Sequence, residues 1–478
     1  MADWTDAVAA YTRGLMDKVK TPGLSMGLAQ DGRTIYAQGF GFRDAERELP
    51  ADPETLYPIA SVTKSFTAVA VMQLQERGLL RVDDPVVKYL PEFRLRDAAH
   101  ARSIRIEHLL SNTSGLPPLV SLYGSLRRSI DADPNASRFM LPERLPELPY
   151  LETCEDLMDF IAEEADAPLG PPGSVFSYSN DGFALLGAVI ERVSGMPYPH
   201  YVTQNILVPA GMTHSGFDPR WAERQPGATQ LYHMAINPPE LIAAPGWWDA
   251  PAMTAAGFLK STVTDMLRYL EIYRTGGVVD GERILSPESV RAMTTPRIPC
   301  GPNMGYAYGL MITPYQGMTL VEHGGNLKGA ASWMTCIPER GLTGVVLSNL
   351  IITPAARIIL GALNARLGLP LEANRFEDRD HPCPPDQLAR YEGRYPSAEG
   401  VVLTVRAEDD GLVLQLLGNE VKARCIGEHL FAFEQYGDLA TVRFVPGPDG
   451  SIWGVLSGFR LIRKAGDTAA TEVAATHG

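Results

Sequence analysis

The chain has 478 residues, of which 45% are hydrophobic and 21% charged, proportions typical of a soluble globular protein rather than a disordered one. Its 56 acidic and 42 basic side chains give a formal net charge of −14, which argues against binding to nucleic acids or anionic membranes. We therefore expect neither as a partner. The length predicts two or three domains, at about 150 residues per domain.

The residue pattern favours a cytoplasmic protein without a cofactor. Asp3 and Asp6 stand where an export signal would have a basic and then an apolar region. The apolar stretch 344–371 is interrupted by Pro354 and Arg357, so it does not qualify as a membrane span. The five cysteines are widely spaced and odd in number, which predicts reduced thiols. The nine histidines show no metal-ligand spacing, so we expect no metal or other cofactor.

The first 80 residues predict a helix, a hairpin and a second, long helix that begins near Ser61. The apolar runs 23–30 and 33–40 flank Asp31-Gly32, a dipeptide typical of two-residue hairpin turns. The run 23–30 also contains a Gly-x-Ser-x-Gly pattern centred on Ser25. That pattern carries chemistry only where a strand turns sharply into a helix, and no helix follows here. We therefore expect Ser25 to pack within a sheet.

The middle of the chain, from about residue 84 to 255, is rich in proline and glycine and contains amphipathic helical segments. Another helix is expected at 257–275. Three short apolar runs beginning at Met318, Ala331 and Thr343 then predict an antiparallel meander. We expect this meander to complete one sheet with the amino-terminal hairpin. The middle region is then a largely helical insertion.

The last hundred residues predict a second unit. Residues 373–385 are charged and contain prolines, a composition typical of a linker. From 386 to 466, repeated strand-like runs separated by Asp-Gly turns predict a small antiparallel β-barrel or sandwich. Residues 467–478 are expected to form a flexible tail. The predicted domains are therefore 1–372 and 386–466.

Ser61 and Lys64 are three residues apart at the start of a helix whose body is almost entirely apolar. Residues at this spacing share a helix face. Desolvation and the helix dipole would both lower the pKa of Lys64, making it a usable proton acceptor for Ser61. The alternative is that Ser61 only caps the helix and Lys64 extends to solvent. This motif alone leaves both interpretations open.

Two further segments carry chemistry-bearing residues. Tyr178 and Asn180 lie on a loop before an apolar helix, where a phenolate could take a proton and an amide could hold both a lysine and a substrate carbonyl. In isolation, Tyr178 would more simply be a packed aromatic. His323 precedes Gly324 and Gly325 in a predicted strand, where glycines would allow another backbone to approach closely. In isolation, this histidine would more simply mark a turn.

Together the three segments resemble the serine β-lactamase and penicillin-binding-protein-like family, in its class C-like branch of D-aminopeptidases, DD-peptidases and esterases. The order S-x-x-K, Y-x-N, H-x-G and the flanking stretches 56–93, 104–117, 171–198 and 255–270 carry the resemblance, which covers residues 8 to 368. It implies an α/β (α+β) fold, an antiparallel sheet flanked by helices with a helical insertion. The carboxy-terminal region resembles the lipocalin-like β-barrel appended to some members.

The resemblance implies a role for each residue. Ser61 would be the acylated nucleophile, with Lys64 and Tyr178 activating it. Asn180 would orient Lys64 and the substrate amide. The backbone N–H groups of Ser61 and Asn326 would form the oxyanion hole, where His323, Gly324 and Gly325 would also bind substrate.

Departures from the family pattern bear on the substrate. His323 replaces the lysine of many β-lactamases, and a neutral imidazole favours substrates without a free carboxylate. Asn112 stands where many relatives have histidine, and residues 119–150 are long enough to form a lid. The pattern at the amino terminus argues against a cell-wall DD-peptidase.

We expect a serine hydrolase that cleaves a small amide or ester, such as a D-amino-acid peptide or amide, through an acyl-enzyme. The alternatives left open are a carboxylesterase or β-lactamase-type activity, a penicillin-binding sensor acylated without turnover, and an acyltransferase. Assembly into a homo-oligomer also stays open.

Overall fold

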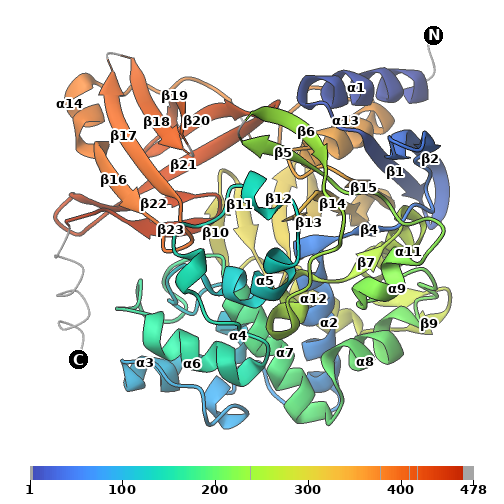
Figure 1. The fold of residues 1–478 in the computed structure, drawn as a ribbon, viewed down its shortest axis with the longest axis horizontal. Coiled ribbons are helices and arrows are strands. Elements are labelled where there is room, and N and C mark those ends of the chain that lie inside the picture. Colours follow the sequence, from blue (N-terminus) through green and yellow to red (C-terminus); the bar gives the residue numbers. More distant parts are fainter. Residues whose placement is uncertain (1–3, 237, 377, 409, 417, 467–478) are drawn as a thin grey trace.

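The computed structural model describes residues 4–236, 238–376, 378–408, 410–416 and 418–466. It contains a nine-stranded sheet with helices packed on it and an eight-stranded sheet that curls into a nearly closed barrel (Figure 1). The predicted mixed fold with an antiparallel sheet and a carboxy-terminal barrel is therefore confirmed. The predicted tail, 467–478, lies outside the described residues.

The amino-terminal hairpin forms as predicted. Helix α1 (Trp4–Val19) is followed by strands β1 (Gly23–Gln30) and β2 (Arg33–Asp44). At the turn, Asp31 and Gly32 have φ angles of 50° and 76°. Aspartate and glycine tolerate this left-handed conformation, which matches the twist of a two-residue hairpin.

The hairpin and the late meander share one sheet, in the order β10-β11-β12-β13-β14-β15-β1-β2-β3. The seam is the antiparallel pairing of β15 with β1, in which Met26 lies opposite Val346. This pairing confirms the predicted completion of the sheet. The remaining strands are β3 (Leu49–Pro50), β10 (Ile298–Gly301), β11 (Met304–Tyr306), β12 (Met311–Tyr315), β13 (Met318–Leu327), β14 (Ala330–Ile337) and β15 (Leu342–Ser348).

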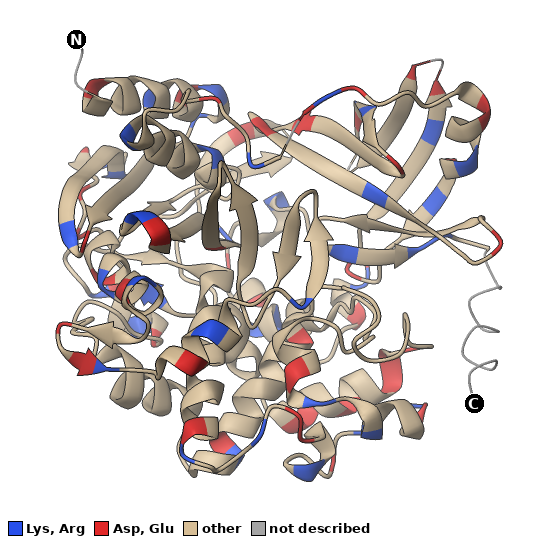
Figure 2. Ribbon diagram, turned by 180° about the vertical axis from the view of Figure 1, so that it is seen from behind, with Lys and Arg blue, Asp and Glu red and all other residues tan. Residues whose placement is uncertain are grey.

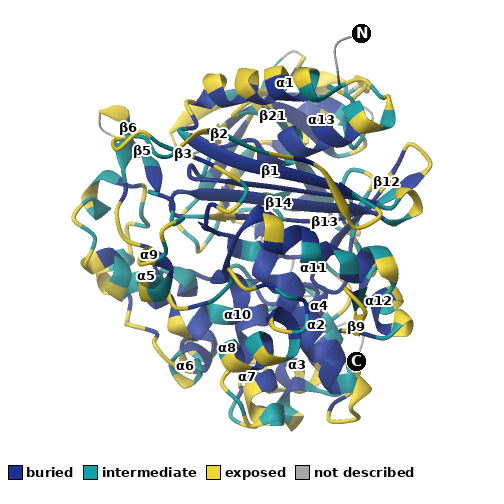
Figure 3. Cartoon of the chain, turned by 90° about the vertical axis from the view of Figure 1, so that its right-hand side faces the viewer, coloured by how far each residue is buried: buried dark blue, intermediate teal, exposed yellow. Residues whose placement is uncertain are grey.

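Helices cover both faces of this sheet. Figure 3 shows α1 and α13 (Ala355–Leu367) on one side and α11 (Val263–Thr275) with further helices on the other. Strands β1 and β15 are buried almost throughout, because each face packs against apolar helix side chains. The packing is close at Gly27, where a Cβ atom would lie 2.5 Å from Val263 Cγ1.

The segment from 84 to 255 is mainly helical, with a two-stranded hairpin, β5 (Tyr232–Ile236) and β6 (Pro239–Ala243). Its helices surround α2 (Thr63–Glu76), which is buried from Thr63 to Leu74. The helices of this segment are α3 (Ala98–Ser103), α4 (Ile106–Leu110), α5 (Ser121–Asp131), α6 (Cys154–Glu164), α7 (Asn180–Ser194), α8 (Tyr198–Val202), α9 (Pro219–Glu223) and the start of α10 (Thr254–Gly257), and α12 (Pro287–Met293) follows later in the chain.

Two short strand pairs complete this region: β4 (Tyr57–Pro58) with β7 (Lys260–Ser261), and β8 (Val278–Val279) with β9 (Glu282–Arg283). Acidic and basic residues are interspersed over the helices and the barrel (Figure 2). Within the described part of the chain, no helix combines the length and apolarity that crossing a bilayer requires.

The barrel is an antiparallel meander with its own apolar core. Tyr395, Phe431 and Phe444 are buried at its centre. Its elements are α14 (Pro385–Leu388), β16 (Gly393–Pro396), β17 (Val402–Glu408), β18 (Gly411–Leu416), β19 (Asn419–Gly427), β20 (Leu430–Gln435), β21 (Asp438–Pro446), β22 (Ile452–Ser457) and β23 (Arg460–Arg463).

The hairpin between β22 and β23 docks the barrel onto the rest of the chain. Tyr178 N donates to Phe459 O at 2.9 Å, and Leu461 N donates to Ser177 Oγ at 3.3 Å. Phe459 also packs against an apolar cluster that includes Phe176 and Tyr306. Two strands of the barrel are therefore tied, by backbone bonds and by apolar contact, to the loop that precedes α7.

The start of the predicted linker is anchored. The guanidinium of Arg375 forms an ion pair at 2.7 Å with Glu322, whose side chain is completely buried on β13. It also lies 5.0 Å from the ring of Trp333 on β14. A division of the chain after this point stays a prediction.

We expect a chain truncated after residue 375 to fold, because it keeps the whole nine-stranded sheet, its covering helices and the Glu322–Arg375 pair. Loss of the barrel exposes Phe176 and its apolar neighbours, so we expect melting on the order of several degrees below the full chain and stronger binding of an apolar dye. Circular dichroism melting and dye fluorescence measure both. A truncated chain without cooperative melting would show that the division into 1–372 and 386–466 is wrong.

Candidate active site

Ser61 lies in the short helical turn Ala60–Val62, directly before α2. Ala60 has a φ of 47°, a left-handed conformation that strains a residue with a side chain. Strand β13 passes so close to this turn that a Cβ atom on Gly325 would lie 2.7 Å from Ser61 N. Strain and close packing together hold the Ser61 hydroxyl at the wall of a cavity of about 350 Å³.

Lys64 is fully buried, and its Nζ atom has three oxygen neighbours. These are Ser61 Oγ at 3.3 Å, Asn180 Oδ1 at 2.8 Å and the carbonyl oxygen of Ala256 at 2.5 Å. Burial lowers the pKa of Lys64 well below its usual value, and the positive charge of Arg460 lowers it further. A neutral amine beside Ser61 Oγ can accept the hydroxyl proton, which activates the serine as a nucleophile. The alternative in which Lys64 extends to solvent is wrong.

The loop before α7 places Tyr178 and Asn180. Ser179 caps the helix by accepting a hydrogen bond from Gly182 N at 3.0 Å, so that Asn180 becomes the first helical residue. The Asn180 side chain points at Lys64, to which its Oδ1 atom is hydrogen-bonded. The ring of Tyr178 lies beside the same amine, with its centroid 4.7 Å from Lys64 Nζ.

Tyr178 is not the phenolate that the sequence suggested as one option. Burial raises the pKa of its hydroxyl above the usual value, and the Ser61 hydroxyl opposes that rise only in part. The hydroxyl is buried and makes no well-formed hydrogen bond to another described residue. Before substrate binds, Tyr178 therefore keeps its proton, and Lys64 is the group suited to accept the proton of the Ser61 hydroxyl.

His323 is buried on β13 and neutral. Its Nδ1 atom lies 2.6 Å from the carbonyl oxygen of Gly324, which requires a proton on Nδ1, and its Nε2 atom lies 3.1 Å from the Tyr306 hydroxyl. Burial lowers the pKa of His323 to about 3. The imidazole therefore carries no charge at neutral pH, as its presence in place of lysine predicted.

The end of β13 presents an open backbone edge. Strand β12 pairs with β13 only as far as Glu322, whereas β14 pairs with it to Leu327. A Cβ atom on Gly324 would lie 2.2 Å from the ring of Trp333, so both glycines of the motif are required by close packing. Asn326 lines the cavity beside this edge, and its side chain donates to Ile351 O at 2.7 Å. Its backbone role as an oxyanion donor stays a prediction.

The barrel contributes residues that the sequence analysis missed. Gly458, Phe459 and Arg460, at the β22–β23 turn, line the same cavity as Ser61. Arg460 lies 4.7 Å from the Tyr178 ring and forms an ion pair at 3.0 Å with Glu399. No local sequence signal marks this contact, because the turn is about 400 residues from Ser61.

Asn112 is hydrogen-bonded to the residues on either side of Tyr178. Its Oδ1 atom accepts from Ser179 N at 2.9 Å, and its carbonyl oxygen accepts from Ser177 N at 3.0 Å. It adopts a φ of 55°, which asparagine tolerates better than most residues. The departure noted in the sequence therefore has a structural role, which its position alone did not indicate.

The segment 119–150 contributes one residue to the wall of the cavity at Ser61. Leu122 on α5 lines it, and Ser121 Oγ donates at 2.5 Å to Asp181, next to Asn180. Further along, Asp133 forms a buried ion pair with Lys328 at the end of β13. These two contacts therefore join the segment 119–150 to α7 and to the residue that follows β13.

Ser25 lies outside this arrangement. It is completely buried in β1, its hydroxyl donates to Asp52 O at 2.6 Å and it lies 3.0 Å from the Tyr57 hydroxyl. A Cβ atom on Gly23 would lie 2.0 Å from Phe42 O, so the glycines around Ser25 serve packing within the sheet. The Gly-x-Ser-x-Gly pattern is a structural feature, as predicted.

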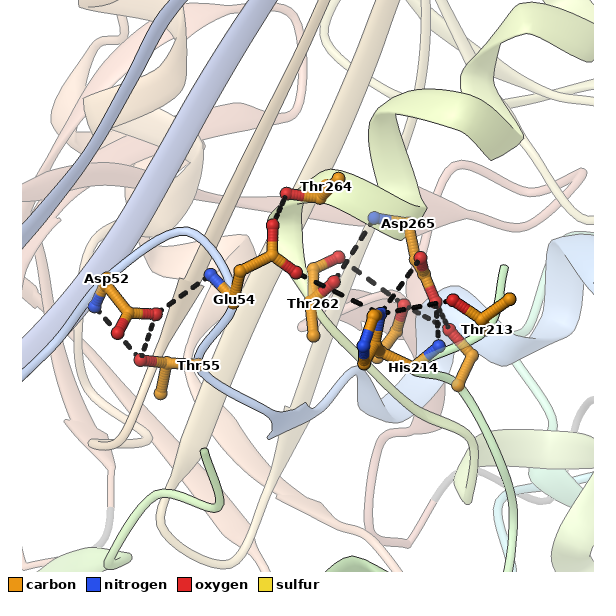
Figure 4. Close-up of polar contacts among 10 residues, drawn as sticks. Asp52, Glu54, Thr55, Thr213, His214, Thr262, Thr264 and Asp265 are labelled. Carbon is orange, nitrogen blue, oxygen red and sulfur yellow. Dashed lines mark hydrogen bonds and ion pairs between the residues drawn. The ribbon is translucent and has the colours of Figure 1, made fainter. Parts of the chain in front are cut away.

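A separate polar cluster, shown in Figure 4, joins the segment around Glu54 to the start of α11. The carboxylate of Asp265 accepts from His214 N at 2.8 Å and from Ser215 Oγ at 2.7 Å. Thr262 caps α11 by accepting from Asp265 N at 3.2 Å. These contacts fasten a loop to a helix end, and they include none of the residues around Ser61.

Comparison with known proteins agrees with this geometry. The profile of the family described as Beta-lactamase matches residues 8–365. The octameric penicillin-binding protein homologue from Pyrococcus abyssi is 30% identical, with a TM-score of 0.68 over 96% of this chain and 100% of that one. A D-stereospecific amidohydrolase from Streptomyces sp. is 25% identical, with a TM-score of 0.59 over 75% of this chain and 97% of that one.

Among curated proteins, Protein flp of Staphylococcus aureus (strain MRSA252) is 25% identical over 337 residues, which cover 70% of this chain. The match spans 61% of the length of that relative. The Pyrococcus abyssi protein is similar over nearly the whole chain, including the barrel.

We expect Ser61→Ala to abolish covalent labelling by a fluorophosphonate, because the Ser61 hydroxyl lies beside the buried amine of Lys64, whose lowered pKa suits it to accept the proton. The labelling rate should fall about a thousandfold or more. The matched control, Ser25→Ala, should label at the rate of the unaltered protein. Loss of labelling in a folded Ser25→Ala protein, with labelling kept in Ser61→Ala, would contradict this assignment.

We expect Arg460→Gln to shift the acid side of the pH–rate profile. Lys64 acts as a base only when neutral, so the labelling rate rises with pH through its pKa. The charge of Arg460 lowers that pKa, so its removal raises the pKa of Lys64 and moves the rise to higher pH.

Labelling rates measured from about pH 6 to about pH 9 should therefore show that Arg460→Gln falls further below the unaltered protein at low pH than at high pH. Arg406→Gln is the control, since Arg406 is an exposed arginine of the barrel that pairs with Glu408 and Glu420. Profiles that are parallel in the Arg460→Gln and unaltered proteins would contradict the electrostatic role.

Proposed function

The chain belongs to the beta-lactamase family, and we propose that it is a serine hydrolase that cleaves a small amide or ester through an acyl-enzyme on Ser61. The resemblance noted in the sequence is thereby confirmed at the level of the family. The observation that carries the proposal is the fully buried amine of Lys64, whose pKa is lowered by burial, at 3.3 Å from Ser61 Oγ. A lysine that is shielded from solvent and has a lowered pKa is better suited to act as a base than to form an ion pair.

In the proposed reaction, Lys64 takes the Ser61 proton as Oγ attacks the substrate carbonyl carbon. The resulting oxyanion accepts hydrogen bonds from the backbone N–H groups of Ser61 and Asn326, each worth about 3 to 4 kcal/mol. The proton passes from Lys64 through the Tyr178 hydroxyl to the leaving group as the carbonyl–leaving-group bond breaks. Water then attacks the acyl-enzyme by the reverse proton path and releases the acid product.

Two features of the site favour substrates without a free carboxylate. His323 is neutral, so the position that is lysine in many β-lactamases supplies no charge. The guanidinium of Arg460 reaches the cavity but is held at 3.0 to 3.3 Å by both oxygens of Glu399. Esters and amides therefore fit better than penicillins. The similarity to a D-stereospecific amidohydrolase supports a D-amino-acid amide or peptide within this class.

Assembly and location complete the proposal. The similarity to an octameric protein over 96% of the chain supports a homo-oligomer. All five cysteines are free, which supports a reducing, cytoplasmic location. The lipocalin-like identity of the barrel is likewise proposed.

The test is a turnover panel that compares D- and L-aminoacyl anilides, a neutral short-chain nitrophenyl ester and a chromogenic cephalosporin. We expect turnover of the ester or of a D-aminoacyl anilide, with loss in Ser61→Ala. A Ser61 adduct that persists for hours with every substrate would favour the sensor, and acceptor-dependent product would favour acyl transfer. Inactivity toward the whole panel would contradict the proposed function.

The same panel tests the basis of the preference. Glu399→Gln frees Arg460, and His323→Lys adds a cation, so both should raise kcat/KM for the cephalosporin relative to the ester by about tenfold, the value of one charge-assisted hydrogen bond. Glu420→Gln, on the outer side of the barrel, should leave the ratio unchanged. A cephalosporin preference in the unaltered protein, with no shift in either variant, would contradict this account.

A further inference from the structure

A second cavity, of about 470 Å³, lies between the barrel and the nine-stranded sheet. It extends from α13 and the start of the linker to strands β17–β22, and its volume is typical of small-molecule sites. Trp333, Gly458, Phe459 and Arg460 line both this cavity and the one at Ser61. The β22–β23 turn therefore forms a shared wall between the two.

Most of the cavity wall is apolar. Leucine and phenylalanine side chains from α13 and from four barrel strands line it: Leu360, Leu403, Leu416, Leu430, Phe433 and Leu456. Such a wall favours an apolar ligand, because contact between the two apolar surfaces removes both from water.

Four arginines also line this cavity, and three of them have partners. Arg357 donates to Tyr11 Oη at 2.9 Å, Arg375 pairs with Glu322 and Arg460 pairs with Glu399. The fourth, Arg443, forms no side-chain hydrogen bond or ion pair with the described residues. Arg443 is therefore the one arginine of this lining whose guanidinium has no hydrogen-bonding partner among the described residues.

The surroundings of Arg443 make its lack of a partner costly. Its neighbours across β21 are Leu430 on β20 and Leu456 on β22, so the guanidinium lies in a row of leucines. The side chain is about half buried, and burial lowers its pKa with no acidic neighbour to offset the effect. A half-buried, unpaired cation destabilises the folded chain, so stability does not explain it.

We propose that this cavity binds a small amphipathic anion, a monocarboxylate with an unbranched apolar chain, whose carboxylate pairs with Arg443. One free guanidinium matches one carboxylate in a two-point hydrogen-bonded pair, whereas a phosphate dianion would require further free cations. The chain lies against the leucines that flank Arg443. This site is separate from Ser61 and does not depend on the proposed hydrolysis.

The binding test uses titration calorimetry on the full chain carrying Ser61→Ala, so that no turnover interferes. Octanoate should bind about tenfold or more tightly than octanol, which has the same chain without the charge, and acetate should not bind. Arg443→Gln should remove the advantage of octanoate over octanol. Arg443→Lys should keep part of it, and Arg406→Gln, on the exposed side of the barrel, should keep all of it.

A thermal melt separates a ligand site from a structural role. Without ligand, Arg443→Gln should melt at or above the temperature of the unaltered protein, because it removes an unpaired, half-buried charge. Equal affinity for octanoate and octanol, or no octanoate binding at all, would overturn the proposal. So would octanoate binding that is unchanged in Arg443→Gln, because that outcome would show that Arg443 does not hold the carboxylate.

Discussion

The burial of the Lys64 amine is the constraint on which the rest of the site depends. Moving a lysine ammonium out of water costs several kcal/mol, so a fully buried lysine is tolerated only when its nitrogen is surrounded by acceptors or loses its proton. Here the three oxygen neighbours of Lys64 Nζ come from the turn Ala60–Val62, from α7 and from α10. The sheet and the helical insertion bring these segments together around one nitrogen atom. The same dry environment that makes the amine a base also strengthens every other electrostatic interaction at Ser61.

The barrel belongs to this site as much as the sheet does. Its β22–β23 turn accepts a hydrogen bond from Tyr178 N, places Arg460 against the Tyr178 ring and closes one wall of the cavity. Arg460 lowers the pKa of Lys64, while Glu399 neutralises the charge that Arg460 would otherwise present to a substrate. One ion pair of the barrel thus affects both the base and the charge of the pocket.

Much of the fold followed from local patterns in the sequence. The Asp31-Gly32 turn, the buried helix after Ser61 and the regular strand spacing of the barrel are each determined by neighbours a few residues apart. The hairpin also argued correctly against Ser25, which lies in a strand, is completely buried and donates its hydroxyl to Asp52 O. Tyr178 was harder to interpret, because its protonation depends on burial, which residue spacing does not report.

The sequence by itself determined the chemical types at the site: a serine and a lysine one helical turn apart, a tyrosine with an asparagine, and a histidine followed by two glycines. It also predicted the neutral state of His323, because imidazole is uncharged above its ordinary pKa. Only the tertiary structure decided which charges act on these groups. Arg460, from the last hundred residues, lines the cavity at Ser61 and pairs with Glu399, and Arg443 faces a cavity that exists only once the barrel is docked. The physical reason is that packing between distant segments sets burial and charge–charge distances, and no local pattern encodes either.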